Sequence, residues 1–443
     1  MSREYSLRNP FARSSILVIA LLVLAGNAAA QDHWVATWAA SAQSPHIAFP
    51  GIRQAPAGPG AAAPSNAPPR FPPPPSFDNQ TVRMIVRSSI GGHHLRVQLS
   101  NAFGDAALRV GTAHIALRDK DSSIVTGSDR ALTFSGEAST IVPVGAEILS
   151  DPVDLDVPPL ADLAISVYIP GHVDTPTEHL TGLHTTFISG AGDFTAAPSI
   201  ENATTQQSWY WLSEVDVLAP ADTGLIVAFG DSITDGATST PDTDRSWPSQ
   251  LAQRLMADKS PSKWAIVNEG ISGNRLLNDG MGVAALARFD RDVLSQPGVK
   301  CVIVMLGIND IGFASLPGAQ ESDRATYQDL IAAHKQLIAR AHLRGIRVVG
   351  ATLTPFSGAM YYSDPGEAAR EAVNDWIRTS GAYDAVIDFD AVVRDPASPK
   401  QIRPSFNIRD HLHPDDDGYK AMADSIDLSI FGAKPKGATL ASH

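Results

Sequence analysis

The sequence predicts an antiparallel β-rich region followed by an α/β domain built on a parallel sheet. Residues 80–218 contain runs in which apolar side chains alternate with polar ones, the period of a strand with one buried face. After residue 220, short continuous apolar runs alternate with segments of helical periodicity. That pattern is typical of a parallel sheet covered on both faces. At 443 residues the chain is long enough for two or three domains.

The first thirty residues have the pattern of a secretory signal peptide. Three arginines among the first 13 residues precede an apolar run over 16–25, and alanines at 28–30 supply a cleavage site before Gln31. The run is shorter than the roughly 20 apolar residues that a membrane span needs. We therefore expect residues 1–30 to be removed, leaving a secreted or periplasmic protein with no stable membrane anchor. An uncleaved N-terminal anchor is the alternative.

The composition narrows the classes of partner. Asp and Glu outnumber Lys and Arg by 47 to 34, which gives a net charge of −13. An acidic surface repels phosphate backbones, so we expect no nucleic-acid partner. The single cysteine, Cys301, lies in an apolar run and is expected to be buried. One cysteine allows neither an intramolecular disulfide nor a cysteine-rich zinc site.

Residues 31–221 form the predicted β-rich accessory domain. Its alternating runs lie at 82–87, 95–99, 153–157 and 163–169. Turn residues separate these runs, which favours an antiparallel sandwich, and Trp34–Ala40 is a further candidate strand. The stretch 50–76 is rich in proline and lacks apolar periodicity, so we expect a long loop. Trp209-Tyr210-Trp211 suits either core packing, which we favour, or stacking on sugar rings.

Residues 222–443 form the predicted α/β domain. Five apolar runs are candidate strands, at 225–229, 264–267, 299–306, 346–351 and 385–387. Between them, Trp247, Leu251 and Leu255 recur at helical spacing. A longer apolar stripe runs from Tyr327 to Ala341.

Polar clusters follow four of these strands, and the first three of the clusters contain glycine. They are Gly230-Asp231-Ser232-Ile233, the segment 268–274, Gly307-Ile308-Asn309-Asp310 and Asp410-His411-Leu412-His413. Ligand sites in open α/β sheets lie beyond the carboxyl ends of the strands. We therefore expect the four clusters to converge at one edge of the sheet.

The residue types in these clusters predict nucleophilic catalysis. A serine hydroxyl such as that of Ser232 is a weak nucleophile and needs a base to take its proton. His413 is the candidate base, and Asp410, three residues earlier, can accept from the imidazole and fix its tautomer. The backbone N–H groups of Ser232 and Gly273 and the side-chain amide of Asn309 are candidate donors to an oxyanion.

Each cluster taken alone has a simpler explanation. Gly-Asp-Ser can be an ordinary turn, Asn309-Asp310 a helix cap, and Asp410 with His413 a capped turn or a metal pair. Asp415-Asp416-Asp417 is expected to cap the final helix rather than bind calcium. Only the four clusters together, in this order at strand ends, favour a hydrolase.

The clusters resemble the signature blocks of the SGNH hydrolases, also called the GDSL esterase/lipase family. Ser232 matches the nucleophile of the first block, and Gly273 and Asn309 match the oxyanion residues of the second and third. Asp410 and His413 match the Asp-x-x-His of the last block.

The resemblance covers roughly residues 222–432. It implies a flavodoxin-like three-layer α/β/α fold and hydrolysis of esters through an acyl-enzyme, with no metal and no organic cofactor. The β-rich half lies outside the minimal family domain. Residues 34–38 and 80–120 resemble N-terminal extensions of secreted bacterial members.

The predicted function is therefore that of a secreted serine esterase acting on a small-molecule or polysaccharide ester. Acetyl or short-chain esters of carbohydrates are favoured by analogy. The alternatives are a lipase or lysophospholipase-type acylhydrolase, a non-catalytic carbohydrate-binding surface protein, and a metal hydrolase using His411, His413 and Asp415. The intact set of five catalytic positions disfavours the binding protein.

Overall fold

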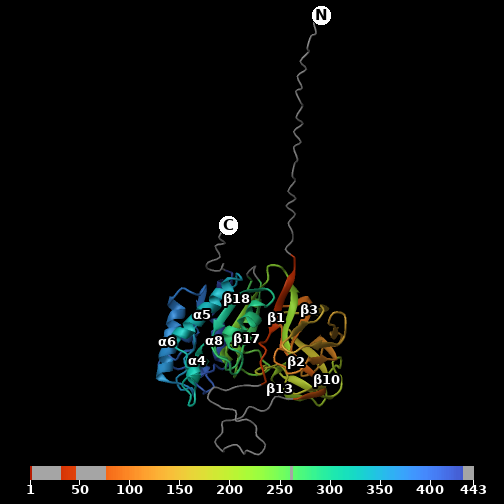
Figure 1. Cartoon of the computed structure of the whole chain (residues 1–443), viewed down its shortest axis with the longest axis horizontal. Helices are drawn as coiled ribbons and strands as arrows, with labels where there is room; N and C mark the ends of the chain where they lie inside the picture. The colour runs from red at the N-terminus through yellow and green to blue at the C-terminus, as the bar shows by residue number, and fades with distance from the viewer. Residues whose placement is uncertain (2–30, 46–75, 260–262, 433–443) are drawn as a thin grey trace, which may run out of the picture.

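The computed structural model of the protein describes residues 1, 31–45, 76–259 and 263–432. An antiparallel β-rich region precedes an α/β region, as predicted (Figure 1). The predicted signal peptide and proline-rich loop lie outside the described residues, apart from Met1 and Ser76.

Two antiparallel sheets build the N-terminal region. The first orders β1 (His33–Ala39), β15 (Leu212–Ala219), β3 (Gly92–Ser100) and β8 (Glu147–Leu149), with β9 (Val153–Val157) also paired to β3. The second orders β13 (Thr204–Gln206), β12 (Thr186–Ala191), β2 (Phe77–Arg87), β10 (Asp162–Val173), β5 (Thr112–Leu117) and β6 (Arg130–Leu132). Two short pairs join β4 (Leu108–Val110) to β7 (Thr140–Val142) and β11 (Glu178–His179) to β14 (Trp209–Tyr210). Val97 of the first sheet and Met84 of the second lie in one apolar core, which confirms the sandwich-like arrangement.

The expectation that each strand has one solvated face is wrong for β2. Its residues 81–86 are all buried, including Arg83. The Arg83 guanidinium donates at 2.6–3.1 Å to the Ser166 hydroxyl and to the carbonyl oxygens of Ser122, Thr195 and Ala197. Loops around residues 122 and 195 therefore cover the outer face and supply the acceptors that a buried cation needs. Burial lowers the pKa of Arg83 to about 10, so the group stays charged at neutral pH.

The Trp209-Tyr210-Trp211 segment belongs to the core, as favoured from the sequence. All three side chains are buried, and the Trp209 indole donates to the Ile85 carbonyl oxygen at 2.8 Å. The Trp209 ring also meets the Trp38 ring edge-on, with centroids 4.9 Å apart. These rings therefore offer no open platform to a sugar.

The C-terminal region is a five-stranded parallel sheet. The strand order is β17 (Trp264–Gly270), β16 (Gly224–Gly230), β18 (Val299–Met305), β19 (Arg347–Ala351) and β20 (Ala385–Ile387). In chain order this is 2-1-3-4-5, the flavodoxin-like arrangement. Each strand coincides with one of the five predicted apolar runs.

Helices cover both faces of this sheet. Ile226 and Ala228 share a core with α1 (Ser232–Asp235), α2 (Trp247–Ala257), α7 (Phe389–Val393) and α8 (Asp416–Asp424). Val227 and Phe229 face the opposite core, which holds α3 (Ala285–Phe289), α4 (Ile308–Phe313), α5 (Tyr327–His342) and α6 (Asp364–Thr379). Successive strand residues point to opposite faces, so the domain has three layers. Cys301 is buried in the first of these cores, as expected.

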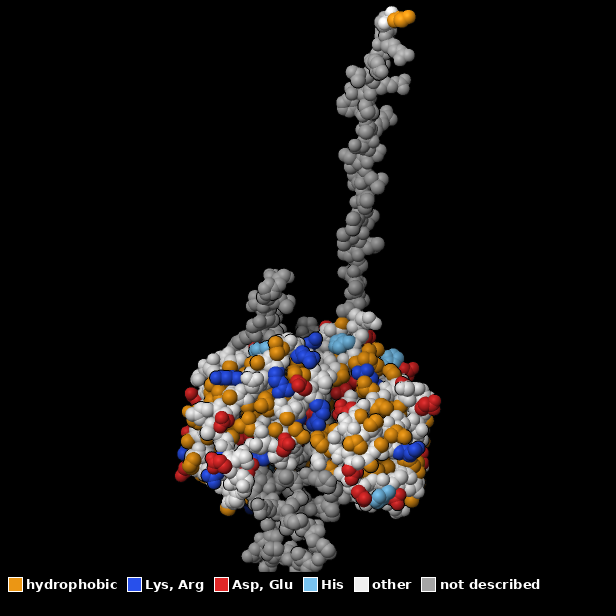
Figure 2. Space-filling view, viewed as in Figure 1, with side chains coloured by type: hydrophobic (Ala, Val, Ile, Leu, Met, Phe, Trp, Pro, Cys, Tyr) orange, Lys and Arg blue, Asp and Glu red, His pale blue; other side chains and the backbone are white. Residues whose placement is uncertain are grey.

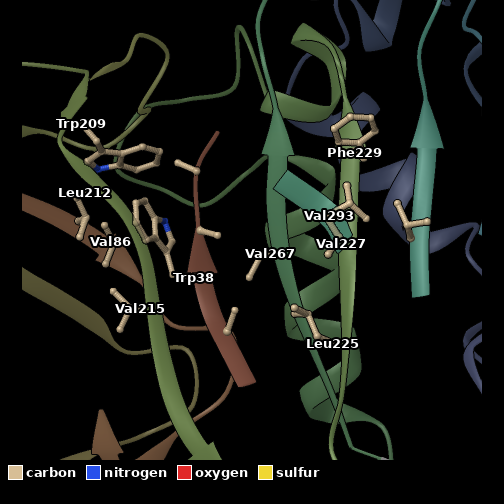
Figure 3. Close-up of a cluster of buried hydrophobic side chains, with 14 of the residues drawn as sticks. Trp38, Val86, Trp209, Leu212, Val215, Leu225, Val227, Phe229, Val267 and Val293 are labelled. Carbon is tan, nitrogen blue, oxygen red and sulfur yellow. The ribbon is translucent and has the colours of Figure 1, made fainter. Parts of the chain in front are cut away.

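Strand β1 joins the two regions into one continuous core (Figure 3). It pairs with β15 and also packs against β17, the edge strand of the parallel sheet. The Ala36 N–H donates to the Pro297 carbonyl oxygen at 3.1 Å, and the Ile266 N–H of β17 donates to the Ser89 hydroxyl at 3.2 Å. The β-rich region thus covers the exposed edge of the parallel sheet, which an isolated α/β domain would leave unpaired.

The surface mixes both signs of charge. On the face shown in Figure 2, acidic and basic side chains are interspersed, with hydrophobic atoms scattered among them. None of the helices in the described part of the chain has the length and apolarity that a membrane crossing requires.

The buried Arg83 yields a stability prediction. We expect Arg83→Met to lower the free energy of unfolding by about 3 kcal/mol or more, because buried carbonyl oxygens lose their donors. Urea unfolding measures this change. The control is Arg109→Met, at an exposed position of β4, which should change stability by less than about 0.5 kcal/mol. Equal effects of the two substitutions would contradict the role assigned to Arg83.

Candidate active site

Ser232 begins helix α1, directly after Asp231 and the inner strand β16. The Asp231 carboxylate caps this helix by accepting the Ile233 N–H at 3.0 Å. Gly230 has no room for a side chain, because a Cβ there would lie 2.0 Å from the Thr234 hydroxyl oxygen. The turn therefore holds the Ser232 hydroxyl at the carboxyl end of the sheet.

A hydrogen-bonded chain links Ser232, His413 and Asp410. His413 Nε2 lies 2.8 Å from Ser232 Oγ, although 181 positions separate the two residues. His413 Nδ1 lies 2.6 Å from Asp410 Oδ2, and Asp410 Oδ1 accepts the backbone N–H groups of Leu412 and His413. An ionised Asp410 requires the proton on Nδ1, which leaves Nε2 to accept the serine proton.

The charge of Asp410 is stabilised locally. Burial acts to raise the pKa of Asp410, but hydrogen bonds from the His413 side chain and from the His413 and Leu412 backbone outweigh it. They hold the pKa well below its usual range. The carboxylate is therefore ionised at neutral pH, as an orienting partner for the imidazole must be.

Gly273 lies on the loop that follows β17, and Asn309 lies in the first turn of α4, which follows β18. Gly273 has φ +76°, a conformation that favours glycine. Asn309 Nδ2 donates to the Asn274 carbonyl oxygen at 3.0 Å, and the Ile271 N–H donates to the Gly230 carbonyl oxygen at 3.2 Å. These bonds link Asn309 to the Gly273 loop, and that loop to Gly230 at the end of β16. The structure thus brings all five predicted site residues to one edge of the sheet.

Asp310 supports the loop that contains Gly273. A helix cap was the alternative role expected from the sequence. That role is not observed, because α4 has no side-chain cap. Its carboxylate instead accepts the Leu276 N–H at 2.7 Å and the Leu277 N–H at 3.0 Å. Burial raises the pKa of Asp310 to about 6. Asp310 therefore fixes the loop that continues from Gly273.

Tyr361 is a site residue that the sequence did not predict. It lies after β19, a strand end for which no polar cluster was proposed. Its hydroxyl donates to Asn309 Oδ1 at 3.3 Å, and a Cβ at Gly312 would lie 2.5 Å from its ring. This bond holds the Asn309 amide with its oxygen toward Tyr361 and its nitrogen, the candidate oxyanion donor, on the opposite side. Its place in the segment between β19 and α6 was the only signal available in the sequence.

The metal site considered at His411, His413 and Asp415 is not formed. Both ring nitrogens of His413 are engaged by Ser232 and Asp410. Asp415 caps α8 by accepting the Gly418 N–H at 2.9 Å, as expected for the acidic run. Within residues 31–45, 76–259 and 263–432, no three His, Cys, Asp or Glu side chains are grouped to hold a metal ion.

The fold and this site define a hydrolase of the α/β class. Residues 228–421 match the family model described as the GDSL-like Lipase/Acylhydrolase family. This part of the chain is therefore a GDSL/SGNH-family hydrolase domain, as the resemblance implied. No curated protein matches the chain.

Several solved structures are similar to about half of the chain. One is a protein of the G-D-S-L family of lipolytic proteins from Desulfitobacterium hafniense DCB-2, 22% identical, covering 45% of this chain and 96% of its own, with TM-score 0.34. Another is Axe2, an acetylxylan esterase from Geobacillus stearothermophilus, 20% identical, covering 48% and 95%, with TM-score 0.37. A third is LAE5, an alpha/beta hydrolase enzyme from the metagenome of Lake Arreo, 20% identical, covering 47% and 95%, with TM-score 0.37.

Asp231 yields a prediction about pH. Burial raises the pKa of Asp231 from 3.8 to about 7, and its Oδ2 has no hydrogen-bond partner among the described residues. Between pH 3.8 and about pH 7, Asp231 keeps its proton in the folded chain and releases it in the unfolded chain. The contribution of Asp231 to the free energy of unfolding therefore falls as pH rises. Asp231→Asn keeps the capping oxygen but cannot ionise. Relative to this variant, the wild type should lose about 2–3 kcal/mol between pH 5 and pH 7.5.

Urea unfolding of both proteins at the two pH values measures that loss. A difference in unfolding free energy between wild type and Asp231→Asn that stays constant with pH would contradict the buried, protonated carboxyl.

Proposed function

We propose that the protein is a serine esterase that hydrolyses carboxylic esters through an acyl-enzyme intermediate. Ser232 is the nucleophile, His413 the general base, and Asp410 the residue that orients the imidazole. The single observation that carries the proposal is the continuous hydrogen-bonded chain from Ser232 Oγ through His413 to Asp410. That the domain belongs to a hydrolase family agrees with it.

The reaction follows from this geometry. His413 Nε2 removes the Ser232 proton as the oxygen attacks the ester carbonyl, and Asp410 stabilises the imidazolium that forms. His413 then protonates the leaving alcohol. Water attacks the acyl-enzyme with the same base, which releases the acid and restores the serine.

The developing oxyanion needs donors held in place beforehand. We assign this role to the backbone N–H groups of Ser232 and Gly273 and to Asn309 Nδ2. Each donor of this kind contributes about 3 kcal/mol to stabilisation of the transition state. Tyr361 and Asp310 act indirectly, because they orient the Asn309 amide and the loop after Gly273.

The finer proposal is that the substrates are acetyl or other short-chain esters, with carbohydrate esters favoured. The leader pattern of residues 1–30 supports export, which would give the protein access to polysaccharides outside the cytoplasm.

The test is hydrolysis of an ester panel by the wild type and by Ser232→Ala. The panel contains p-nitrophenyl acetate, p-nitrophenyl palmitate and acetylated xylo-oligosaccharides. We expect the acetyl esters to be hydrolysed faster than the palmitate. Ser232→Ala should lower kcat by about 10³-fold or more, because the residual rate comes only from binding and the oxyanion donors.

Ser315→Ala, at an exposed serine, is the matched control and should keep full activity. Preference for the palmitate would instead favour the lipase alternative. No turnover of any ester, together with binding of the polysaccharide, would favour the carbohydrate-binding protein. Loss of activity on chelation with EDTA would favour a metal hydrolase.

A further inference from the structure

A buried histidine–carboxylate pair connects the β-rich region to helix α1, which begins at Ser232. His179 of β11 comes from the β-rich region, and Asp235 is the last residue of α1. His179 Nε2 lies 3.1 Å from Asp235 Oδ1, and both side chains are only 3% exposed. The pair therefore crosses the boundary between the two regions inside the protein.

The partners of His179 define its charge. Nε2 faces a carboxylate and Nδ1 lies 2.9 Å from the Ser41 carbonyl oxygen, and both of these groups can only accept. A ring that donates from both nitrogens is an imidazolium. Burial acts to lower the pKa of His179, but Asp235 and the Ser41 carbonyl raise it overall. Two charges are thus paired in the interior.

The other oxygen of Asp235 reaches the loop after β17 that contains Ser272 and Gly273, which we call the oxyanion loop. Asp235 Oδ2 accepts the Ser272 backbone N–H at 2.8 Å and the Ser272 hydroxyl at 2.7 Å. Ser272 directly precedes Gly273. Since α1 begins at Ser232 and ends at Asp235, one carboxylate connects the helix of the nucleophile to the loop of the oxyanion donor.

The β-rich region holds the same loop at two further points. Thr181 Oγ1 donates to the Ser272 hydroxyl at 3.0 Å. Gln43 Nε2 donates to the Met281 carbonyl oxygen at 2.6 Å, and the Met281 side chain lies against Gly273. Two side chains that an isolated α/β domain would lack, those of Thr181 and Gln43, therefore help to hold the Gly273 segment.

We propose that His179 and Asp235 are positioning residues, through which the β-rich region sets the place of the Gly273 N–H relative to the Ser232 hydroxyl. The inference rests on the proposed esterase function. It makes the N-terminal region part of the catalytic unit rather than a separate accessory module.

The kinetic signature follows from the role of an oxyanion donor. Such a donor interacts more strongly with the transition state than with bound substrate, so its displacement lowers kcat and leaves KM nearly unchanged. Displacement by about 1 Å can reduce the rate by about 10²-fold. A defect in folding would lower the apparent kcat in the same way, because it reduces the concentration of active enzyme, so kcat is expressed per folded molecule.

The experiment measures kcat and KM of the full chain with p-nitrophenyl acetate. For His179→Ala we expect a fall in kcat of about 10- to 100-fold, with KM within about twofold of wild type. His179→Gln keeps a donor toward Asp235 and should recover part of the lost kcat. Thr181→Val, which removes one donor to Ser272, should lower kcat less than His179→Ala does.

His184→Ala is the matched control. His184 is also a buried histidine of the β-rich region, and its Nε2 lies 3.0 Å from Asp244 of the α/β region. Its hydrogen bond does not lead to Ser272, so this substitution should lower stability but leave kcat per folded molecule unchanged.

Hydrogen–deuterium exchange gives a readout independent of activity. His179→Ala should speed exchange at the Ser272 and Gly273 amides, while His184→Ala should not, with β16 amides as the internal reference. If kcat and exchange both stay at wild-type values in folded His179→Ala, the inference is overturned. If that variant does not fold, His179→Gln and Thr181→Val decide the question in the same way.

Failure of the proposed function gives a different result. A wild type without esterase activity, or a Ser232→Ala variant with full activity, would overturn the esterase assignment. The exchange measurement would still show whether His179 and Asp235 hold the Gly273 loop.

Discussion

The chemistry proposed for this protein depends on the hydrogen bond between His413 and Ser232. A serine hydroxyl becomes a useful nucleophile only when a base lies within hydrogen-bonding distance. The two residues are 181 positions apart, so their 2.8 Å contact depends on the tertiary fold that brings the two segments together. Strand order and the turn at Gly230 are thus conditions of catalysis, because they bring the nucleophile and the base to the same edge.

The β-rich region also contributes to the positions of the site residues. Strand β1 extends one apolar core from the sandwich to the parallel sheet and covers the edge strand β17. From this region, His179 and Thr181 reach Asp235 and Ser272 beside the oxyanion loop. Neither set of contacts belongs to the residues that would act on a substrate. They nevertheless fix the spacing between the nucleophile and the donor at Gly273.

Local patterns in the sequence predicted the strands, the helices and the candidate site. They did not predict the loops and side chains that cover these elements. Periodicity identified all five parallel strands, and the rule that sites lie at strand ends brought together Ser232, Asn309 and His413. Periodicity describes the faces of a single strand, however, so it could not show that loops bury Arg83 on the outer face of β2. His179 carries no motif and sits on a two-residue strand. Its contact with Asp235 forms only in the folded chain, where segments far apart in the sequence come together.

Reaction with a fluorophosphonate, followed by peptide mapping by mass spectrometry, tests the central claim most directly. Such reagents form a stable adduct with a serine only when a neighbouring base activates it. The account predicts a single adduct on the peptide containing Ser232 in the wild type, and its loss in His413→Ala. An adduct at another serine, or equal labelling of Ser232 without the imidazole, would contradict it.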